Sequence, residues 1–190
     1  MSEQRTRIVI DPYEQRWPQE FEALQRQLVD ALGGLAVRVD HIGSTSVPDL
    51  AAKDVIDIQV GVTDIDEPGI VEAFLRLGAT ATSITSDHVP PGDEHGSAGW
   101  RKLVFRPPAS WRPTNLHVRA VGQPNHRYAL LFRDYLRATS SAVAAYAQIK
   151  TALARLHPDD PRAYDDVKDP VCDLIMDAAE LWAAGEGWRP

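Results

Sequence analysis

HIGSTSVPDLAAKDVIDIQV, residues 41–60, places a turn of small and hydroxyl-bearing residues ahead of an apolar, strand-like run. In that run Ile56, Ile58 and Val60 alternate with Asp57 and Gln59, which predicts a strand with one face in the core. An isolated buried carboxylate is costly, so the other face must give Asp57 a partner or a metal ion. The stretch therefore predicts a strand whose aspartate has a specific partner, either a polar side chain or a metal ion.

Two interpretations of that charge remain open from the pattern. A carboxylate beside a turn rich in N–H donors suits a site for phosphate and a divalent cation, with Asp57 on the metal. The alternative is an aspartate at a strand end that a neighbouring amide caps. Gly-Ser turns are common, so the local pattern does not decide between them.

The rest of the chain predicts an α/β fold with a mixed sheet. Strands and helices alternate early, and helices accumulate late, so we expect helices on the faces of the sheet and a helical C-terminal section. No repeat or linker divides the chain, and we expect a single domain over residues 1–190. The expected helices are 18–32, 68–77, 126–137, 141–156 and 161–184, the last interrupted at Pro170, and the expected strands are 36–42, 54–62, 101–106 and 115–121.

Composition limits the function classes. The chain has 190 residues, 44% hydrophobic and 25% charged, with a formal net charge of -7, which argues against sequence-independent binding to nucleic acid or to an anionic membrane. Cys172 is its one cysteine, so neither an internal disulfide nor a cysteine-based zinc site is expected. The first residues carry no apolar stretch of signal-peptide length, and no segment could span a bilayer. We expect a cytoplasmic protein.

The central block resembles a known family. Gly43-Ser44, twelve further residues and then Asp57 within VIDIQV is similar to the signature of the nucleotidyltransferase superfamily with the polymerase-beta-like fold. Over nearly its whole length the chain resembles the GrpB family, through YEQRWPQEFEAL, VDHIGSTSVPDLAAKDVIDIQV, VFRPP, NLHV, FRDYLRA and AYAQIKTALA. The resemblance implies the fold. It implies less about the reaction, because some members are described only as accessory to dephospho-CoA kinase.

The chain departs from the superfamily where the chemistry would lie. Gln59 stands at the second acidic position of the strand, and a neutral amide is a poor Mg²⁺ ligand. The third acidic residue of the superfamily usually comes from a later strand, for which the candidate here is NLHVR, where alternation puts Asn115, His117 and Arg119 on one face. If that strand lies beside the Asp57 strand, His117 or Asn115 occupies the third position. Asp57 alone carries too little negative charge for two metal ions. We therefore expect Asp57, Gln59 and His117 to form the reactive group, with one Mg²⁺ on Asp57 or with no metal.

Further residues are candidates for binding a substrate. His41 adjoins the turn and could act as acid, base or phosphate donor, although a structural histidine is the alternative. Basic residues could hold an anion, although most such side chains are solvated or paired with acids. The candidate set is His41, Gly43, Ser44, Thr45, Ser46, Lys53, Lys102, Asn115, Arg119, Arg133 and Lys150. The stretch SDHVPPGDEHGSAGW, residues 86–100, predicts a mobile loop that could cover the cleft and not a metal site.

Two functions from different classes stay open. One is an enzyme that transfers a nucleotidyl or other phosphoryl-containing group to a small acceptor. The other is a non-catalytic protein of the same fold that binds a nucleotide or an anionic small molecule, or that serves another enzyme as an accessory. Gln59 favours the second, and the turn with Asp57 and His117 favours the first.

Overall fold

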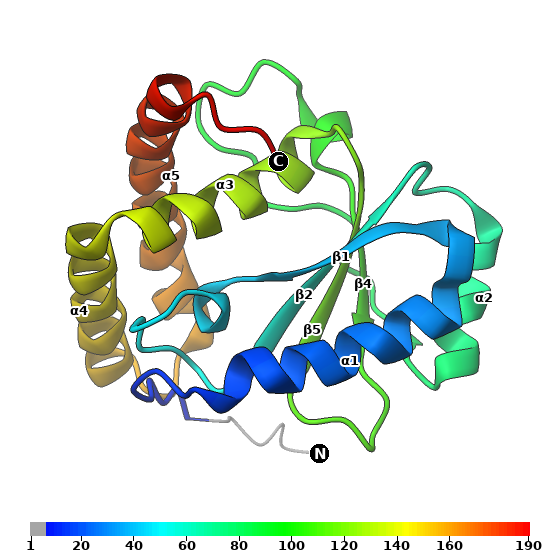
Figure 1. Cartoon of the computed structure of the whole chain (residues 1–190). Helices are drawn as coiled ribbons and strands as arrows, with labels where there is room; N and C mark the ends of the chain where they lie inside the picture. Colours follow the sequence, from blue (N-terminus) through cyan, green and yellow to red (C-terminus); the bar gives the residue numbers. More distant parts are fainter. Residues whose placement is uncertain (1–6) are drawn as a thin grey trace.

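A five-stranded mixed sheet forms the centre of the computed structural model, which describes residues 7–190 (Figure 1). Residues 1–6, part of the stretch in which we expect no signal peptide, lie outside the described residues. The strand order is β1-β2-β5-β4-β3, and β2 and β5 run parallel while the other neighbours are antiparallel. The strands are β1 (Ala36–Ile42), β2 (Ile56–Val62), β3 (Thr80–Ala81), β4 (Leu103–Arg106) and β5 (Thr114–Ala120).

Helices flank this sheet, and the last three gather as a C-terminal section beside it (Figure 1). The predicted α/β class, with a mixed sheet and a helical C-terminal section, is confirmed. The α-helices are α1 (Arg16–Leu32), α2 (Pro68–Leu77), α3 (Pro124–Ala138), α4 (Ser140–Leu156) and α5 (Pro161–Glu186), and the 3-10 turns are η1 (Gly33–Leu35), η2 (Ser44–Ser46) and η3 (Ser97–Trp100).

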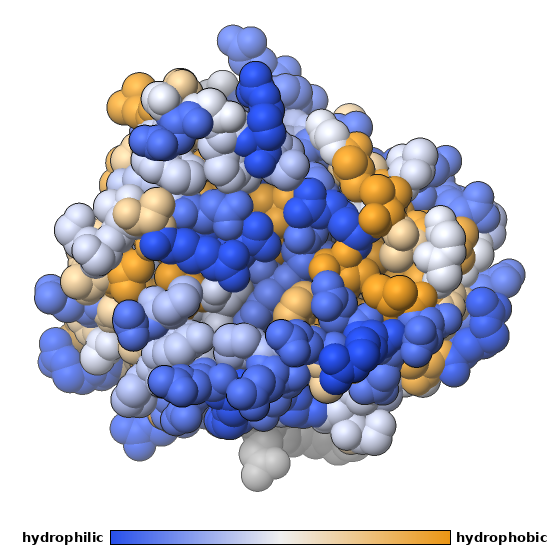
Figure 2. Space-filling view, in the orientation of Figure 1, coloured by the Kyte–Doolittle hydropathy of each residue, from blue (hydrophilic) through white to orange (hydrophobic). Residues whose placement is uncertain are grey.

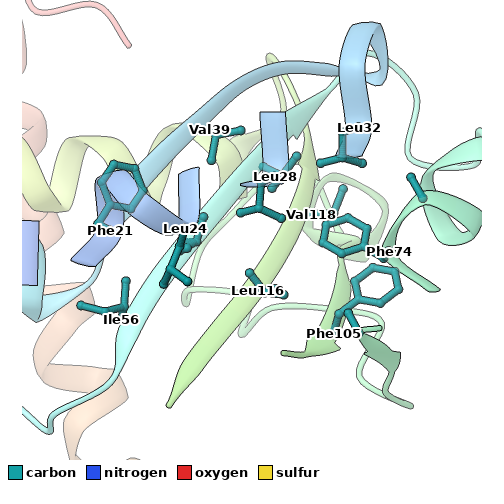
Figure 3. Packing of buried hydrophobic residues seen from close by; sticks show 14 of the residues in the cluster. Phe21, Leu24, Leu28, Leu32, Val39, Ile56, Phe74, Phe105, Leu116 and Val118 are labelled. Carbon is teal, nitrogen blue, oxygen red and sulfur yellow. The ribbon is translucent and has the colours of Figure 1, made fainter. Parts of the chain in front are cut away.

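The main core lies between one face of the sheet and helices α1 and α2 (Figure 3). The apolar stripe of α1 packs on the strand residues that alternation assigned to the core, such as Ile56 and Leu116. Phe74 of α2 stacks on Phe105 of β4 with ring centroids 4.1 Å apart. Because one face of β2 is taken up by this core, Asp57 points to the opposite face, toward helices α3, α4 and α5.

Several element ends shift by one or two residues from the expected bounds, and the structure differs further in two places. Helix α5 continues through Pro170, which is exposed, so the carbonyl that proline leaves unbonded can face water. The expected interruption at Pro170 is therefore wrong. The two-residue strand β3 pairs with β4 and was not predicted, because two residues carry no periodicity.

The surface gives no sign of a large apolar face in the orientation of Figure 1. Figure 2 shows mainly hydrophilic side chains there, with hydrophobic areas between them. Among the helices within residues 7–190, none combines the length and the hydropathy that crossing a membrane requires.

Candidate functional site

A cavity of about 520 Å³ lies between the polar face of the sheet, the turn η2 and helices α3 to α5. Asp57 and Asn115 reach it from the neighbouring strands β2 and β5, where they are paired in register. Gly43, Ser44 and Thr45 of the turn form part of its wall. The structure thus brings together the turn and the aspartate that the sequence singled out.

The turn is held rigidly against Asp57. Gly43 has φ +67°, and a Cβ at that position would lie 2.3 Å from Oδ2 of Asp57, so only glycine fits without strain. The hydroxyl of Ser46 donates to the carbonyl of Gly43 at 2.6 Å, and that of Thr45 donates to the carbonyl of Val55 at 3.2 Å. Ser44 is the hydroxyl of the turn that remains directed at the cavity.

Asp57 is half-buried and has a polar but uncharged neighbour. Asn115 Nδ2 donates to Oδ1 of Asp57 at 2.7 Å, and Nε2 of His117 lies 4.0 Å from the same oxygen. Burial raises the pKa of the Asp57 carboxyl, and the hydrogen bond from Asn115 offsets this only in part. In the described part of the chain no lysine or arginine forms an ion pair with Asp57. Asp57 therefore faces the cavity without a direct ion-pair partner, although Lys168, Arg119 and Lys53 act on its charge from a longer distance.

His117 lies on the same face as Asp57, as strand alternation predicted, but it does not line the cavity. Burial lowers the pKa of its imidazole well below the usual value, so the ring is neutral at physiological pH. Its Nδ1 is buried without a hydrogen-bond partner among the described residues.

Gln59, the third member of the expected reactive group, lies in the interior. Its side chain is fully buried, with Oε1 accepting from Arg119 Nη1 at 2.7 Å and Nε2 donating to the carbonyl of His126 at 3.2 Å. Both ends of the amide are therefore occupied, and Gln59 does not reach the cavity.

Asp87, which sequence reasoning did not single out, neutralises two of the candidate cations. Its carboxylate accepts from Lys102 Nζ at 2.6 Å and from Arg119 Nε at 2.8 Å, and Asn125 also donates to it. Although burial raises the pKa of Asp87, the hydrogen bonds from Arg119 and Lys102 outweigh burial and hold that pKa below its usual range. Lys102 and Arg119 line the cavity as paired groups.

The same pairing fixes part of the loop at residues 86–100. Asp87 is bound from β5, and His88 Nε2 lies 2.8 Å from the carboxylate of Asp173 on α5. Both loop residues line the cavity. These two residues of the loop therefore form part of the cavity wall, held by contacts with β5 and α5.

Lys150 and Lys53 have no such partner. Lys150 is buried, donates to Ser44 Oγ at 2.8 Å and lies 4.7 Å from the ring centroid of Tyr146. Burial lowers the pKa of Lys150 to about 7, and it also lowers that of Lys53, whose ammonium lies 4.2 Å from the ring centroid of Tyr164. Neither lysine forms an ion pair with a carboxylate of residues 7–190. Asp165 and Asp57 act on Lys53 and Asp57 acts on Lys150 only at longer range, so both amines can still accept an anionic partner in the cavity.

Two predicted binding residues have structural surroundings instead. His41 is buried, its ring stacks on Phe21 at 4.7 Å, and Nε2 lies 3.0 Å from Thr45 Oγ1. Burial lowers the pKa of His41 to about 3. Arg133 pairs with Asp134 and donates to the carbonyl of His41, which ties α3 to β1. Neither residue lines the cavity, and neither does Ser46.

A family model described as "GrpB protein" matches residues 7–178. The chain belongs to the GrpB family.

A crystal structure of the conserved GrpB protein from Enterococcus faecalis has a TM-score of 0.73 and 29% identity, over 92% of this chain and 99% of that chain. A dephospho-CoA kinase of Mycolicibacterium paratuberculosis is 36% identical over 202 residues, 98% of this chain and 49% of the relative. A structure of Cid1 in complex with its short product ApU is 14% identical with a TM-score of 0.49, over 74% of this chain and 40% of that chain, a likeness too distant to inform the site.

This GrpB chain thus spans about half the length of the kinase-named relatives it matches. Their name does not say which half carries the activity that it describes.

The side chains do not fit a centre of two magnesium ions. Within residues 7–190 no three His, Cys, Asp or Glu side chains are grouped so as to hold a metal ion. Gln59 is occupied in the interior, and Asn115 already donates to Asp57. Asp57 alone fits at most one Mg²⁺ that brings phosphate oxygens and waters as its other ligands.

Proposed function

We propose that this GrpB protein binds a phosphorylated small molecule of the nucleotide class in the cavity. The observation that carries the proposal is the distribution of lysine. Every lysine of the chain, namely Lys53, Lys102, Lys150 and Lys168, lines this one cavity, although the chain as a whole has a net charge of -7. Four aspartates, Asp57, Asp87, Asp165 and Asp169, line the cavity as well, so its attraction for an anion depends on the lysines that these carboxylates do not pair.

Two of these four lysines already form ion pairs with carboxylates of the protein. Lys102 is paired with Asp87, and Lys168 with Asp165 and Asp169. Lys53 and Lys150 are the uncompensated pair, and the Ser44 hydroxyl lies beside Lys150. Phosphate oxygens placed between these two ammonium groups and the turn would receive charge-assisted hydrogen bonds.

Aromatic side chains support a nucleotide over inorganic phosphate. Trp100, Tyr128 and Phe132 line the same cavity. Rings of this kind stack on nucleobases of any sequence. Asp57, which forms no ion pair with a lysine or arginine of residues 7–190, would then face a part of the ligand with hydroxyl groups or a metal ion.

Nucleotidyl transfer is the second candidate function, favoured by the uncompensated Asp57 beside the turn. Asp57 and phosphate oxygens of the ligand would hold one Mg²⁺, which neutralises charge on the phosphates. The half-length match to proteins named dephospho-CoA kinase adds dephospho-CoA to the ligands worth testing, and an accessory role to such an enzyme as a further form of the binding function.

Calorimetric titration tests the proposal with pyrophosphate, ATP, UTP and dephospho-CoA, each with and without Mg²⁺. We expect at least one nucleotide to bind, and Lys150→Met to weaken that binding by roughly 10- to 100-fold, the equivalent of one lost charged hydrogen bond. Arg106→Gln is the matched control, because Arg106 is exposed and does not line the cavity. Absence of binding across the panel, or equal weakening in the control, would refute the proposal. Tighter binding with Mg²⁺ that Asp57→Asn abolishes would support the transfer candidate.

A further inference from the structure

Ser44 and Lys150 form a pair that phosphate binding alone does not require. Lys150 Nζ lies 2.8 Å from Ser44 Oγ, within the range of a direct hydrogen bond. The other two hydroxyls of the turn bond to backbone carbonyls. The one hydroxyl that faces the cavity is thus the one that contacts a buried amine.

The surroundings of Lys150 suit a base. The amine comes from the middle of α4, is 3% exposed and forms no ion pair with a carboxylate of residues 7–190. Burial without a counterion favours the neutral amine, whose lone pair can accept a proton. The charged or titratable groups that act on it are Asp57 from β2, Cys172 and Lys168 from α5, and Lys53. None of these donates to Nζ or accepts from it.

We propose that Ser44 Oγ is a nucleophile toward phosphorus and that Lys150 is the general base that activates it. The step rests on the proposed function for its natural substrate, a nucleotide or related phosphate ester held in the cavity. A serine hydroxyl is a weak nucleophile until an adjacent base takes its proton, and a neutral lysine within hydrogen-bond distance is such a base.

The Oγ–P bond of Ser44 forms as the P–O bond to the leaving phosphate breaks, and the hydroxyl proton passes to Lys150 Nζ. The leaving phosphate or pyrophosphate carries the electron pair away. The ester formed on Ser44, phosphoryl or nucleotidyl, is then attacked by an acceptor hydroxyl or by water, whose proton passes to solvent. The Oγ–P bond breaks, and Lys150 returns its proton to the leaving Oγ, which restores the Ser44 hydroxyl and the neutral amine. No oxidant or reductant is needed.

This chemistry would explain how a transfer site works with one acidic residue. Direct in-line attack by the acceptor in two-ion sites uses metal ions to stabilise both the attacking and the leaving oxygens. A serine hydroxyl that is deprotonated by a neighbouring base supplies the attacking oxygen, so a second metal ion is not needed to activate it. Lys53 is placed at the same cavity to compensate charge on the phosphoryl oxygens.

A fluorophosphonate ester tests the pair directly, because it presents an electrophilic phosphorus with fluoride as its leaving group and needs no nucleotide pocket. We expect stoichiometric labelling of the full chain, measured by intact mass and mapped by peptide sequencing to Ser44. Ser44→Ala should abolish the adduct. Lys150→Arg should slow labelling by at least 100-fold, because arginine stays protonated and cannot act as base. Lys150→Met gives a second variant in case arginine disturbs folding, and melting temperatures of all variants are recorded.

Every result of this experiment either supports or overturns the roles proposed for Ser44 and Lys150. The proposal is supported if Ser44 is labelled, if Lys150→Arg slows that labelling, and if the same variant still binds pyrophosphate in calorimetry. Such a result separates the role of Lys150 as a base from a role in anion binding. No adduct on the wild-type chain, an adduct elsewhere, or full-rate labelling in folded Lys150→Arg or Lys150→Met would overturn the proposal. Labelling of Ser44 in a chain that binds none of the nucleotides would refute the proposed function and leave the pair standing. Nucleotide binding without labelling of Ser44 would refute the roles proposed for Ser44 and Lys150 and leave the proposed function standing.

Discussion

Arg119 holds Gln59 in the interior of the molecule, with Nη1 donating to Oε1 at 2.7 Å. The other end of the amide, Nε2, donates to the carbonyl of His126. A residue that occupies an acidic position of the resembled signature is thereby used to join β2, β5 and the first turn of α3. Its role here is structural, and the cavity depends on it only through the position of Arg119.

Replacing Gln59 by glutamate tests that relationship. One carboxylate oxygen would accept from Arg119, but the other would face the carbonyl of His126, which cannot donate. We expect Gln59→Glu to destabilise the fold by about 1–3 kcal/mol, the cost of an unsatisfied buried group, and to leave Mg²⁺ affinity unchanged. Urea denaturation and a Mg²⁺ titration measure the two effects.

The control is Gln27→Glu, because Gln27 is exposed and its Oε1 accepts from Trp111, a bond that glutamate keeps. Tighter Mg²⁺ binding by Gln59→Glu would show that residue 59 reaches the cavity after all.

The contact between Gly43 and Asp57 gives a second prediction. Alanine at position 43 must adopt φ +67° and place its Cβ 2.3 Å from Oδ2 of Asp57. We expect Gly43→Ala to cost about 1–3 kcal/mol from backbone strain, with the clash adding to that cost. Asp57→Ala in the same chain should relieve the contacts with Oδ2 and Cγ, but it keeps the Cβ of residue 57 at 2.9 Å and leaves the backbone strain unchanged.

A double-mutant cycle by denaturant unfolding isolates the coupling. We expect a favourable interaction energy of about 0.5–3 kcal/mol between the two substitutions. Additive losses would mean that the turn does not press on Asp57.

Much of this architecture could be predicted from local pattern. The alternation in residues 56–60 correctly placed Ile56 and Ile58 in the core and Asp57 on the opposite face, because the period of a strand is fixed by its geometry. The turn before it was visible as a run of small residues. Some of the family-like sequence proves structural: Trp17 in YEQRWP is fully buried and donates to Asp54 Oδ1 at 2.6 Å.

What the sequence could not give is the pairing between distant segments. Asp87 stands in a loop with no periodicity, and its partners Lys102 and Arg119 are 15 and 32 residues away. Nothing local distinguishes a paired lysine such as Lys102 from an unpaired one such as Lys150. The four lysines share one cavity only because α4 and α5 pack beside the turn, and that packing depends on contacts between distant parts of the sequence.

Asp87 supplies a third prediction, in which stability and affinity change in opposite directions. Asp87→Asn removes the charge that compensates Lys102 and Arg119, both largely buried. We expect a loss of roughly 3 kcal/mol, typical of a buried pair that loses one partner. Pyrophosphate should bind more tightly, because two cations at the cavity are released.

Denaturation and calorimetry on the same variant measure both changes. Asp66→Asn is the matched control, since its ion pair with Arg101 is exposed and should shift stability by less than about 1 kcal/mol. Weaker pyrophosphate binding by Asp87→Asn would mean that Asp87 orders the anion site instead of competing with it.

The last prediction concerns the pH dependence of stability that Lys150 imposes. Its pKa is about 7 in the folded protein against 10.5 for a free lysine, because burial disfavours the ammonium. Below pH 7 the group is protonated in both states and its burial penalty is constant. Between pH 7 and 10.5 the unfolded chain binds more protons, so the contribution of Lys150 to the free energy of unfolding rises with pH. From pH 7 to pH 9 we expect that rise to be roughly 2 kcal/mol.

Lys150→Met should remove this rise in stability. Lys168→Met should keep it, because ion pairs with Asp165 and Asp169 raise the pKa of Lys168, which stays protonated over this range. Urea denaturation of the three proteins between pH 6.5 and 9 measures the difference, and parallel curves for wild type and Lys150→Met would show that Lys150 is charged in the empty cavity and cannot serve Ser44 as a base.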